Sequence, residues 1–172
     1  MNKVGFDILL ATNYVVGGPH QPNKRREQHR ALLSKFNPET STWKDTKPYS
    51  CGFCETVVDF IQNQNEIVHS AIRLAKFWMY TLVLLDHRHG FSYATELLIA
   101  HAAKVLTGRF DELSVPSIFN EYLKQIVNWQ HLKAFWTEYY TENQISSRCR
   151  AQMPLLLDPS NPWNNVAMEI PW

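Results

Sequence analysis

Residues 67–85 read IVHSAIRLAKFWMYTLVLL, the most informative pattern in the chain. At about 100° per residue, this stretch predicts one long helix. Its apolar stripe is formed by Ile67, Ala71, Leu74, Trp78, Leu82 and Leu85. Further apolar side chains lie off the stripe, so we expect the helix to be apolar over most of its circumference and central in the fold.

The polar residues of this helix share one narrow face, formed by His69, Arg73, Lys76 and Tyr80. The simpler interpretation is the solvated side of a core helix. The alternative is a cationic strip that faces a cleft. There Arg73 and Lys76, one turn apart, would grip phosphates, Arg73 through its planar guanidinium and Lys76 as a point charge.

Helical periodicity also predicts the surrounding elements. We expect helices near 54–63, 91–107, 117–128 and 130–141, and a charged surface helix from Asn23 to Leu33. Ser114 and Pro116 suit the first turn of the 117–128 helix. Residues 37–50 are predicted to be loop, and residues 153–162 a short extended run closed by proline turns.

The chain opens on an apolar segment, residues 4–10, that predicts a short β-strand. An isolated strand leaves its backbone groups unpaired. We therefore expect either that an earlier part of the fold is absent or that a partner supplies the missing sheet. The predicted fold class is mainly α, a helical domain with a short N-terminal β remnant, α+β overall.

Composition narrows the class of protein. The 45% hydrophobic and 19% charged residues argue against wholesale disorder. Lys and Arg number 17 against 16 Asp and Glu, so no global field attracts nucleic acid or an anionic membrane. The longest apolar run, residues 77–85, spans about 14 Å as a helix, roughly half a bilayer core. We expect no membrane association.

The cysteines suggest a compartment rather than a site. The chain has three cysteines, Cys51, Cys54 and Cys149. An odd number does not form a complete set of disulfides, which favours a reducing compartment and hence the cytoplasm, with the nucleus as a second location. Cys51 and Cys54 form a CxxC, but no second pair lies nearby to complete a zinc site.

The helix over 91–107 carries two further candidates. Ser92 suits an N-cap, and a helix N-terminus also favours phosphate through its free N–H groups and dipole. Tyr93 beside it could stack on a base. His101 lies on the apolar side of this helix, where a hydrogen-bonded core histidine is expected rather than a ligand.

Five strings together resemble one family, the 2′-5′-oligoadenylate synthetases. Residues 72–78, IRLAKFW, are similar to its IRLVKHW helix, and residues 92–98, SYATELL, to its QYALELL. Residues 136–140, WTEYY, resemble WTKYY, and residues 156–159, LLDP, resemble ILDP. Residues 6–11, FDILLA, are similar to the FDVLPA strand that carries the third metal-binding carboxylate. The strings occur in the family's order.

The resemblance implies a nucleotidyltransferase lobe joined to a helical second domain, with the active site between them. Residues 1–20 would end that lobe, and residues 21–172 would form the helical domain. The family joins ATP molecules through 2′-5′ links, usually with double-stranded RNA bound, in antiviral signalling. Carried across, Asp7 would be a catalytic carboxylate on Mg²⁺. Arg73, Lys76, Ser92 and Tyr93 would bind nucleotide, with Tyr93 near the donor base.

The sequence also departs from the family pattern. It contains no Gly-Ser and no Asp-x-Asp string, and Asp7 alone cannot hold two metals. We therefore expect the isolated chain to be inactive without the missing N-terminal nucleotidyltransferase lobe. Residues 57–66, where the family is rich in Lys and Arg, carry no positive charge, so we expect weak or altered dependence on RNA.

Two alternatives remain open at this point. Ser92 replaces the family's Gln, and a Ser-Tyr pair is similar to cyclic GMP–AMP synthase-like relatives, which would make a cyclic dinucleotide. A non-catalytic family member, acting as a binding or scaffold protein, would not need the family's first two carboxylates, which this chain lacks. Retention of Asp7, Arg73 and Lys76 argues against that alternative.

Overall fold

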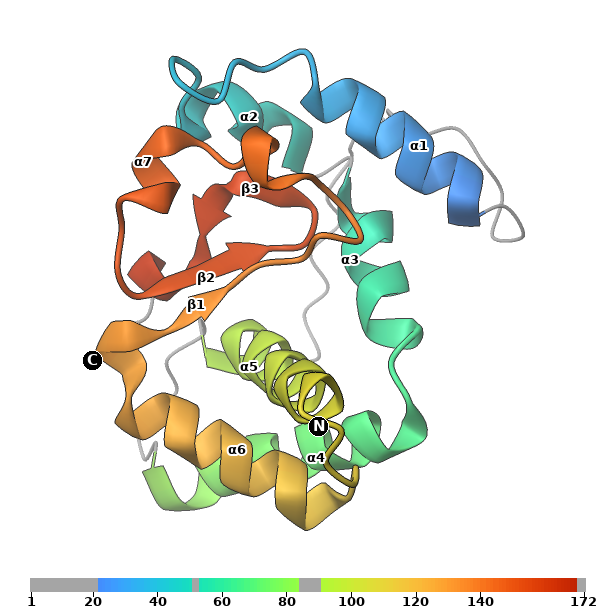
Figure 1. Cartoon of the computed structure of the whole chain (residues 1–172), viewed down its shortest axis with the longest axis vertical. Coiled ribbons are helices and arrows are strands. Elements are labelled where there is room, and N and C mark those ends of the chain that lie inside the picture. Colours follow the sequence, from blue (N-terminus) through green and yellow to red (C-terminus); the bar gives the residue numbers. More distant parts are fainter. Residues whose placement is uncertain (1–21, 51–52, 84–90, 170–172) are drawn as a thin grey trace, which may run out of the picture.

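The computed structural model describes residues 22–50, 53–83 and 91–169 (Figure 1). Its α-helices are α1 (Pro22–Leu33), α2 (Trp43–Ser50), α3 (Cys54–Gln62), α4 (Glu66–Trp78), α5 (Phe91–Gly108), α6 (Val115–Val127) and α7 (Ser147–Arg150). Its strands are β1 (Lys133–Ala134), β2 (Leu155–Asp158) and β3 (Asn161–Asn165). The mainly α, α+β class is confirmed. The expected strand at residues 4–10 lies outside the described residues.

Helix α5 lies at the centre of the molecule (Figure 1). It contacts α4 and α6 on one side and β2 on the other, while α4 and α6 also contact each other. Helix α6 begins where its sequence predicts: the Ser114 hydroxyl accepts a hydrogen bond from the Ser117 N–H at 3.2 Å, and Pro116 fits the first turn. These three helices form the lower half of the fold in the figure.

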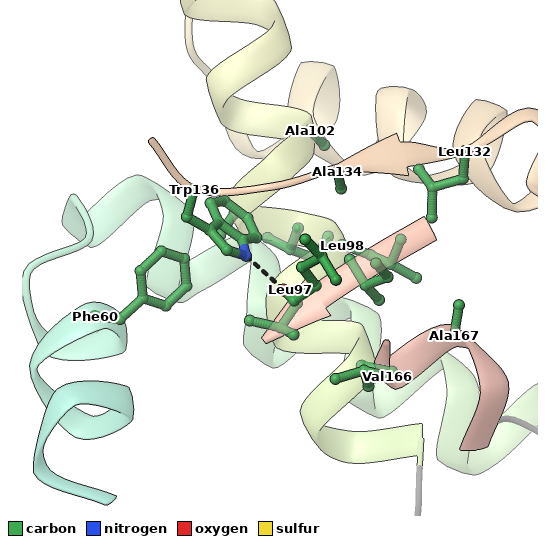
Figure 2. Packing of buried hydrophobic residues seen from close by; sticks show 14 of the residues in the cluster. Phe60, Leu97, Leu98, Ala102, Leu132, Ala134, Trp136, Val166 and Ala167 are labelled. Atoms are coloured by element: carbon green, nitrogen blue, oxygen red, sulfur yellow. Dashed lines mark hydrogen bonds between the residues drawn. The ribbon is translucent and has the colours of Figure 1, made fainter. Parts of the chain in front are cut away.

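A small sheet closes the other side of α5. Strand β1 runs parallel to β2, and β2 pairs antiparallel with β3. Trp136, just after β1, is 2% exposed, and its indole N–H donates to the Leu157 carbonyl at 2.6 Å. The ring of Phe60, from α3, meets it edge-on at 4.6 Å between centroids (Figure 2). Trp136 therefore ties the sheet to α3.

Two predicted elements are wrong. Residues 130–141 do not form an α-helix; they contain the end of a 3₁₀ turn (Trp129–His131), β1 and turns. Lys133 is exposed while Ala134 and Trp136 are buried, which is the period-2 pattern of a strand. Residues 37–50 are not all loop, since α2 begins at Trp43. Asp45 accepts hydrogen bonds from the N–H and hydroxyl of Thr42, at 2.7 and 2.8 Å, which fixes that helix start.

The buried stripe of α4 also differs from the predicted one. The inward side chains of this helix and the turn after it are Val68, Ala71, Ile72, Ala75 and Met79. Leu74 is 39% exposed and Phe77 66% exposed, so α4 buries one side and leaves another to solvent. The helix continues as a π-helical turn (Met79–Val83) instead of running regularly to residue 85.

Helix α1 is held by its basic residues. Arg30 donates to the carbonyls of Glu138, at 2.6 Å, and Tyr139, at 3.3 Å. Arg26 lies over the Tyr139 ring, 5.2 Å from its centroid. Part of the basic run therefore serves packing. No helix within the described ranges is long and apolar enough to cross a membrane.

Candidate functional site

Arg73 lies on the exposed face of α4. Its side chain is 65% exposed, and its Nη2 reaches Glu66 Oε1 at 2.8 Å and the Ser70 hydroxyl at 2.9 Å. The bond from Arg73 lowers the pKa of Glu66, which keeps that carboxylate charged. An ion pair this open to water is readily exchanged, because solvent screens it and competes for both partners. The guanidinium can therefore turn to another anion.

Lys76 connects α4 to α5. Its ammonium forms an ion pair with the Glu96 carboxylate. The side chains of Lys76 and Glu96 are 36% and 21% exposed, so this pair is more enclosed than the one at Arg73. The pair joins the two strings that resemble the family on separate helices, residues 72–78 and 92–98. We call the surface formed by Arg73, Lys76, Ser92 and Glu96 the α4–α5 surface.

The side chains of Ser92 and Tyr93 lie in different environments, one exposed and the other partly buried. Ser92 is exposed in the first turn of α5, one turn before Glu96 and on the same side of the helix. Tyr93 is half-buried, and its hydroxyl is buried beside Asp158 without a hydrogen bond of ordinary geometry. Burial, and then the nearby Asp158 charge, raise the pKa of the Tyr93 hydroxyl. The tyrosine tip thus belongs to the interior.

Asp158 organises the turn between β2 and β3. Its Oδ1 accepts from the N–H and hydroxyl of Ser160 at 2.7 and 2.6 Å, and its Oδ2 from Asn164 at 3.3 Å. Burial outweighs these bonds and raises the pKa of the carboxyl. The Ser160 carbonyl lies 2.6 Å from His29 Nε2 on α1, and desolvation lowers the pKa of His29 to about 4. This LLDP string therefore acts in folding.

The structure brings together part of the predicted site. Lys76 reaches α5, whose first turn carries Ser92, and Arg73 lies one turn before Lys76 on α4. Asp7 lies outside the described residues, so its position relative to these groups stays a prediction. Sequence reasoning missed Glu96 as the partner of Lys76. The sequence did point to Glu96, because this residue lies within the SYATELL string that resembles the family.

The described residues offer no metal centre. Within them, no group of three or more His, Cys, Asp or Glu side chains is placed to hold a metal ion. Cys54 is exposed, and its CxxC partner Cys51 is outside the described part. His101 is the predicted core histidine: its Nδ1 lies 3.3 Å from Gln125 Oε1, and burial lowers its pKa. The carboxylates here therefore do not fit a Mg²⁺ site.

Residues 26–172 are similar to a known protein family. This range matches the family model described as 2′-5′-oligoadenylate synthetase 1, domain 2, C-terminus. The chain belongs to the 2′-5′-oligoadenylate synthetase family. The match covers every α-helix described after α1 and the entire described sheet.

Individual proteins similar to this chain belong to the same family. The chain is 30% identical to 2′-5′-oligoadenylate synthase 1A of Mus musculus, over 96% of this chain and 46% of that protein. It is also 30% identical to inactive 2′-5′-oligoadenylate synthase 1B of Rattus norvegicus, over 96% of this chain and 44% of that one. It shares 25% identity with 2′-5′-oligoadenylate synthase-like protein 2 of Mus musculus, over 72% of this chain and 26% of that protein. The chain spans less than half the length of these relatives.

Proposed function

We propose that this chain forms the helical half of a 2′-5′-oligoadenylate synthetase-like nucleotidyltransferase and that its α4–α5 surface binds the phosphates of ATP. The observation that carries the proposal is the Lys76–Glu96 ion pair, which holds the two family-like strings against each other across α4 and α5. Arg73, one turn before Lys76, then presents a guanidinium to the same surface.

The two cations have different roles in this proposal. Arg73 would release Glu66 and bind the triphosphate through two parallel N–H bonds, since a phosphate carries more charge than a carboxylate. Lys76 is already neutralised by Glu96, so it would act first by positioning α5 and second by its charge. Ser92 would add a hydroxyl at the start of α5, and the exposed part of the Tyr93 ring would contact the base.

The whole protein would join ATP molecules through 2′-5′ links in antiviral signalling, in the cytoplasm or nucleus. The resemblance also implies Mg²⁺ with Asp7 among its ligands. The residues described here do not form such a site, so we assign no step of the reaction to a metal. The chain by itself is expected to be inactive: incubation with ATP and Mg²⁺ should give no 2′-5′-linked product, and any such product would refute this expectation.

The binding half of the proposal is tested by titrating the full chain with ATP. Arg73→Ala should weaken binding about tenfold, the loss of one charge-assisted phosphate contact. The matched control is Arg109→Ala, because Arg109 is also exposed and also pairs with a glutamate, Glu121, at 3.3 Å. Equal affinities for the wild type and Arg73→Ala would contradict the proposal.

A second candidate is a non-catalytic family member that binds nucleotide or RNA without chemistry. It is favoured by a relative of equal identity whose name calls it inactive, and by the lack of an Asp-x-Asp string in this sequence. ATP binding without product in the longest natural form of the protein would support this candidate. Cyclic-dinucleotide synthesis by that form would support the Ser92–Tyr93 alternative instead.

Double-stranded RNA is proposed as a weak partner. Within residues 57–66, Val58 is 49% exposed, and the other exposed groups there are amides and Glu66. A duplex contact on this surface would release few counterions, so binding should be weak and only mildly salt-dependent. Tight, steeply salt-dependent binding in a filter assay would contradict this proposal.

A further inference from the structure

A pocket of about 490 Å³ lies where the start of α2, the helix α7 and strand β3 meet. This volume falls in the usual range of small-ligand pockets, about 300–1,000 Å³. The pocket shares no lining residue with the α4–α5 surface. Its contents are therefore independent of the function proposed above.

The charge of the pocket is positive. Lys44 and Arg148 line it, and neither forms an ion pair with any residue that the structure describes. Among the described residues that line the pocket there is no Asp or Glu. Asp45, next to Lys44 in the chain, is occupied by the two hydrogen bonds from Thr42. Two cations with no carboxylate partner among the described residues favour an anion.

Hydrogen-bond donors add to this preference. Trp163 lines the pocket and is 3% exposed, yet its indole N–H finds no acceptor among the described residues. This N–H is closed to water, so the Trp163 ring is part of the pocket wall and its N–H resonance reports on what lies against that wall. The first turn of α2 also borders the pocket, and the leading N–H groups of a helix have no acceptor within the helix and lie at its positive end.

The remaining wall is apolar. Trp43 is half-buried and Met168 is 51% exposed, and both line the pocket. A planar ring could lie against such an indole and thioether. We propose that this pocket binds a phosphomonoester, whose phosphate contacts Lys44 and Arg148, with the Trp163 ring in the pocket wall. The ester is either a nucleoside monophosphate, with its base against Trp43, or a sugar phosphate without a ring.

The test is a titration of the full ¹⁵N-labelled chain, followed at the Trp163 indole N–H resonance, which Trp163→Phe identifies. The probes are AMP, ribose 5-phosphate and adenosine. AMP or ribose 5-phosphate should shift this resonance to saturation, and adenosine should not. Tighter binding of AMP would identify the nucleotide as the ligand, and equal binding the sugar phosphate.

The variants decide whether the charge is responsible. Lys44→Ala and Arg148→Ala should each weaken binding about fivefold or more. Lys47→Ala, on the same helix as Lys44, removes the same charge outside the pocket and should leave affinity unchanged. The proposal is overturned if neither phosphate shifts the resonance, if adenosine shifts it as AMP does, or if Lys47→Ala weakens binding equally.

Discussion

The turn between β2 and β3 and the α4–α5 surface both carry charged groups in hydrogen bonds, but they differ in exposure. Asp158 is 8% exposed and accepts three hydrogen bonds, from Ser160 and Asn164, whereas the Glu66 side chain that pairs with Arg73 is 77% exposed. A buried group loses a large solvation energy if its partner leaves, and an exposed one regains water. The turn therefore maintains the fold, and the surface can change partners.

This difference in exposure assigns different roles to the sequence strings that resemble the family. Trp136, from WTEYY, and Asp158, from LLDP, are buried and bonded within the chain. Arg73, from IRLAKFW, lies on the solvent side of α4, and Lys76 in the same string is half-buried beside Glu96 of α5. Substitutions in the first two strings should alter folding, and those in the third should alter binding.

The largest effect is expected at Trp136. Trp136→Ala should cost about 3–5 kcal/mol of unfolding free energy, since it removes a large buried ring and leaves the Leu157 carbonyl unpaired. Urea unfolding measures this loss. If the variant does not fold, Trp136→Phe keeps much of the volume and should cost about 1–3 kcal/mol. Phe110→Ala is the control, because Phe110 is 97% exposed and should cost little.

Stability should fall on acidification because of His29. Its pKa in the fold is about 4, against 6.5 in the unfolded chain, so between these values the unfolded state binds the extra proton. The loss begins as pH falls through 6.5 and reaches about 3 kcal/mol near pH 4. Above pH 6.5 this histidine is neutral in both the folded and the unfolded state, so it does not make the unfolding free energy depend on pH.

Unfolding curves across this range provide the measurement. His29→Gln, which retains a donor toward the Ser160 carbonyl, should flatten the slope. His131→Gln, at an exposed histidine, should leave it unchanged. A wild-type slope retained in His29→Gln would show that another group carries the pH dependence.

Asp158→Ala should cost about 1–3 kcal/mol, because it leaves the buried N–H of Ser160 without an acceptor. Asp111→Ala removes the same charge from an exposed loop position and serves as the control. Thermal or urea unfolding of the pair separates the two effects. Equal stabilities of the two variants would place Asp158 with the exposed groups and remove the contrast.

The smallest stability effects belong to the α4–α5 surface. Lys76→Ala should cost up to about 1 kcal/mol, because Glu96 stays partly enclosed without its partner. Arg73→Ala should leave the urea midpoint unchanged, since Glu66 returns to water. If Arg73→Ala is the less stable of the two, the exposed pair is structural and the α4–α5 surface is less free than proposed.

Sequence reasoning succeeded where the signal was local. Ser114 and Pro116 mark the start of α6 by cap chemistry that depends on a few adjacent residues. It failed at residues 130–141, because the short strand β1 exists only through pairing with β2, some twenty residues later. The start of α2 was readable in principle from Thr42 and Asp45, but Pro48 and the preceding Thr-Ser run favoured a loop.

The candidate site was only partly predictable for the same reason. Arg73 and Lys76 follow from helical spacing, which fixes that they share a face. The Lys76–Glu96 contact joins residues from different helices and depends on how α4 and α5 pack. Likewise, burial of the Tyr93 hydroxyl depends on β2, which no property of the segment around Tyr93 reveals.

The location of bound ATP is the most direct test of the proposed function. ATP should be added to the ¹⁵N-labelled full chain while backbone amide shifts are followed. The account predicts saturable shifts at Arg73, Lys76 and Ser92. In Arg73→Ala the shifts at Lys76 and Ser92 should need about tenfold more ATP, and in Arg109→Ala all three should be unchanged. Shifts confined to other parts of the molecule, with those three amides unmoved at saturating ATP, would contradict it.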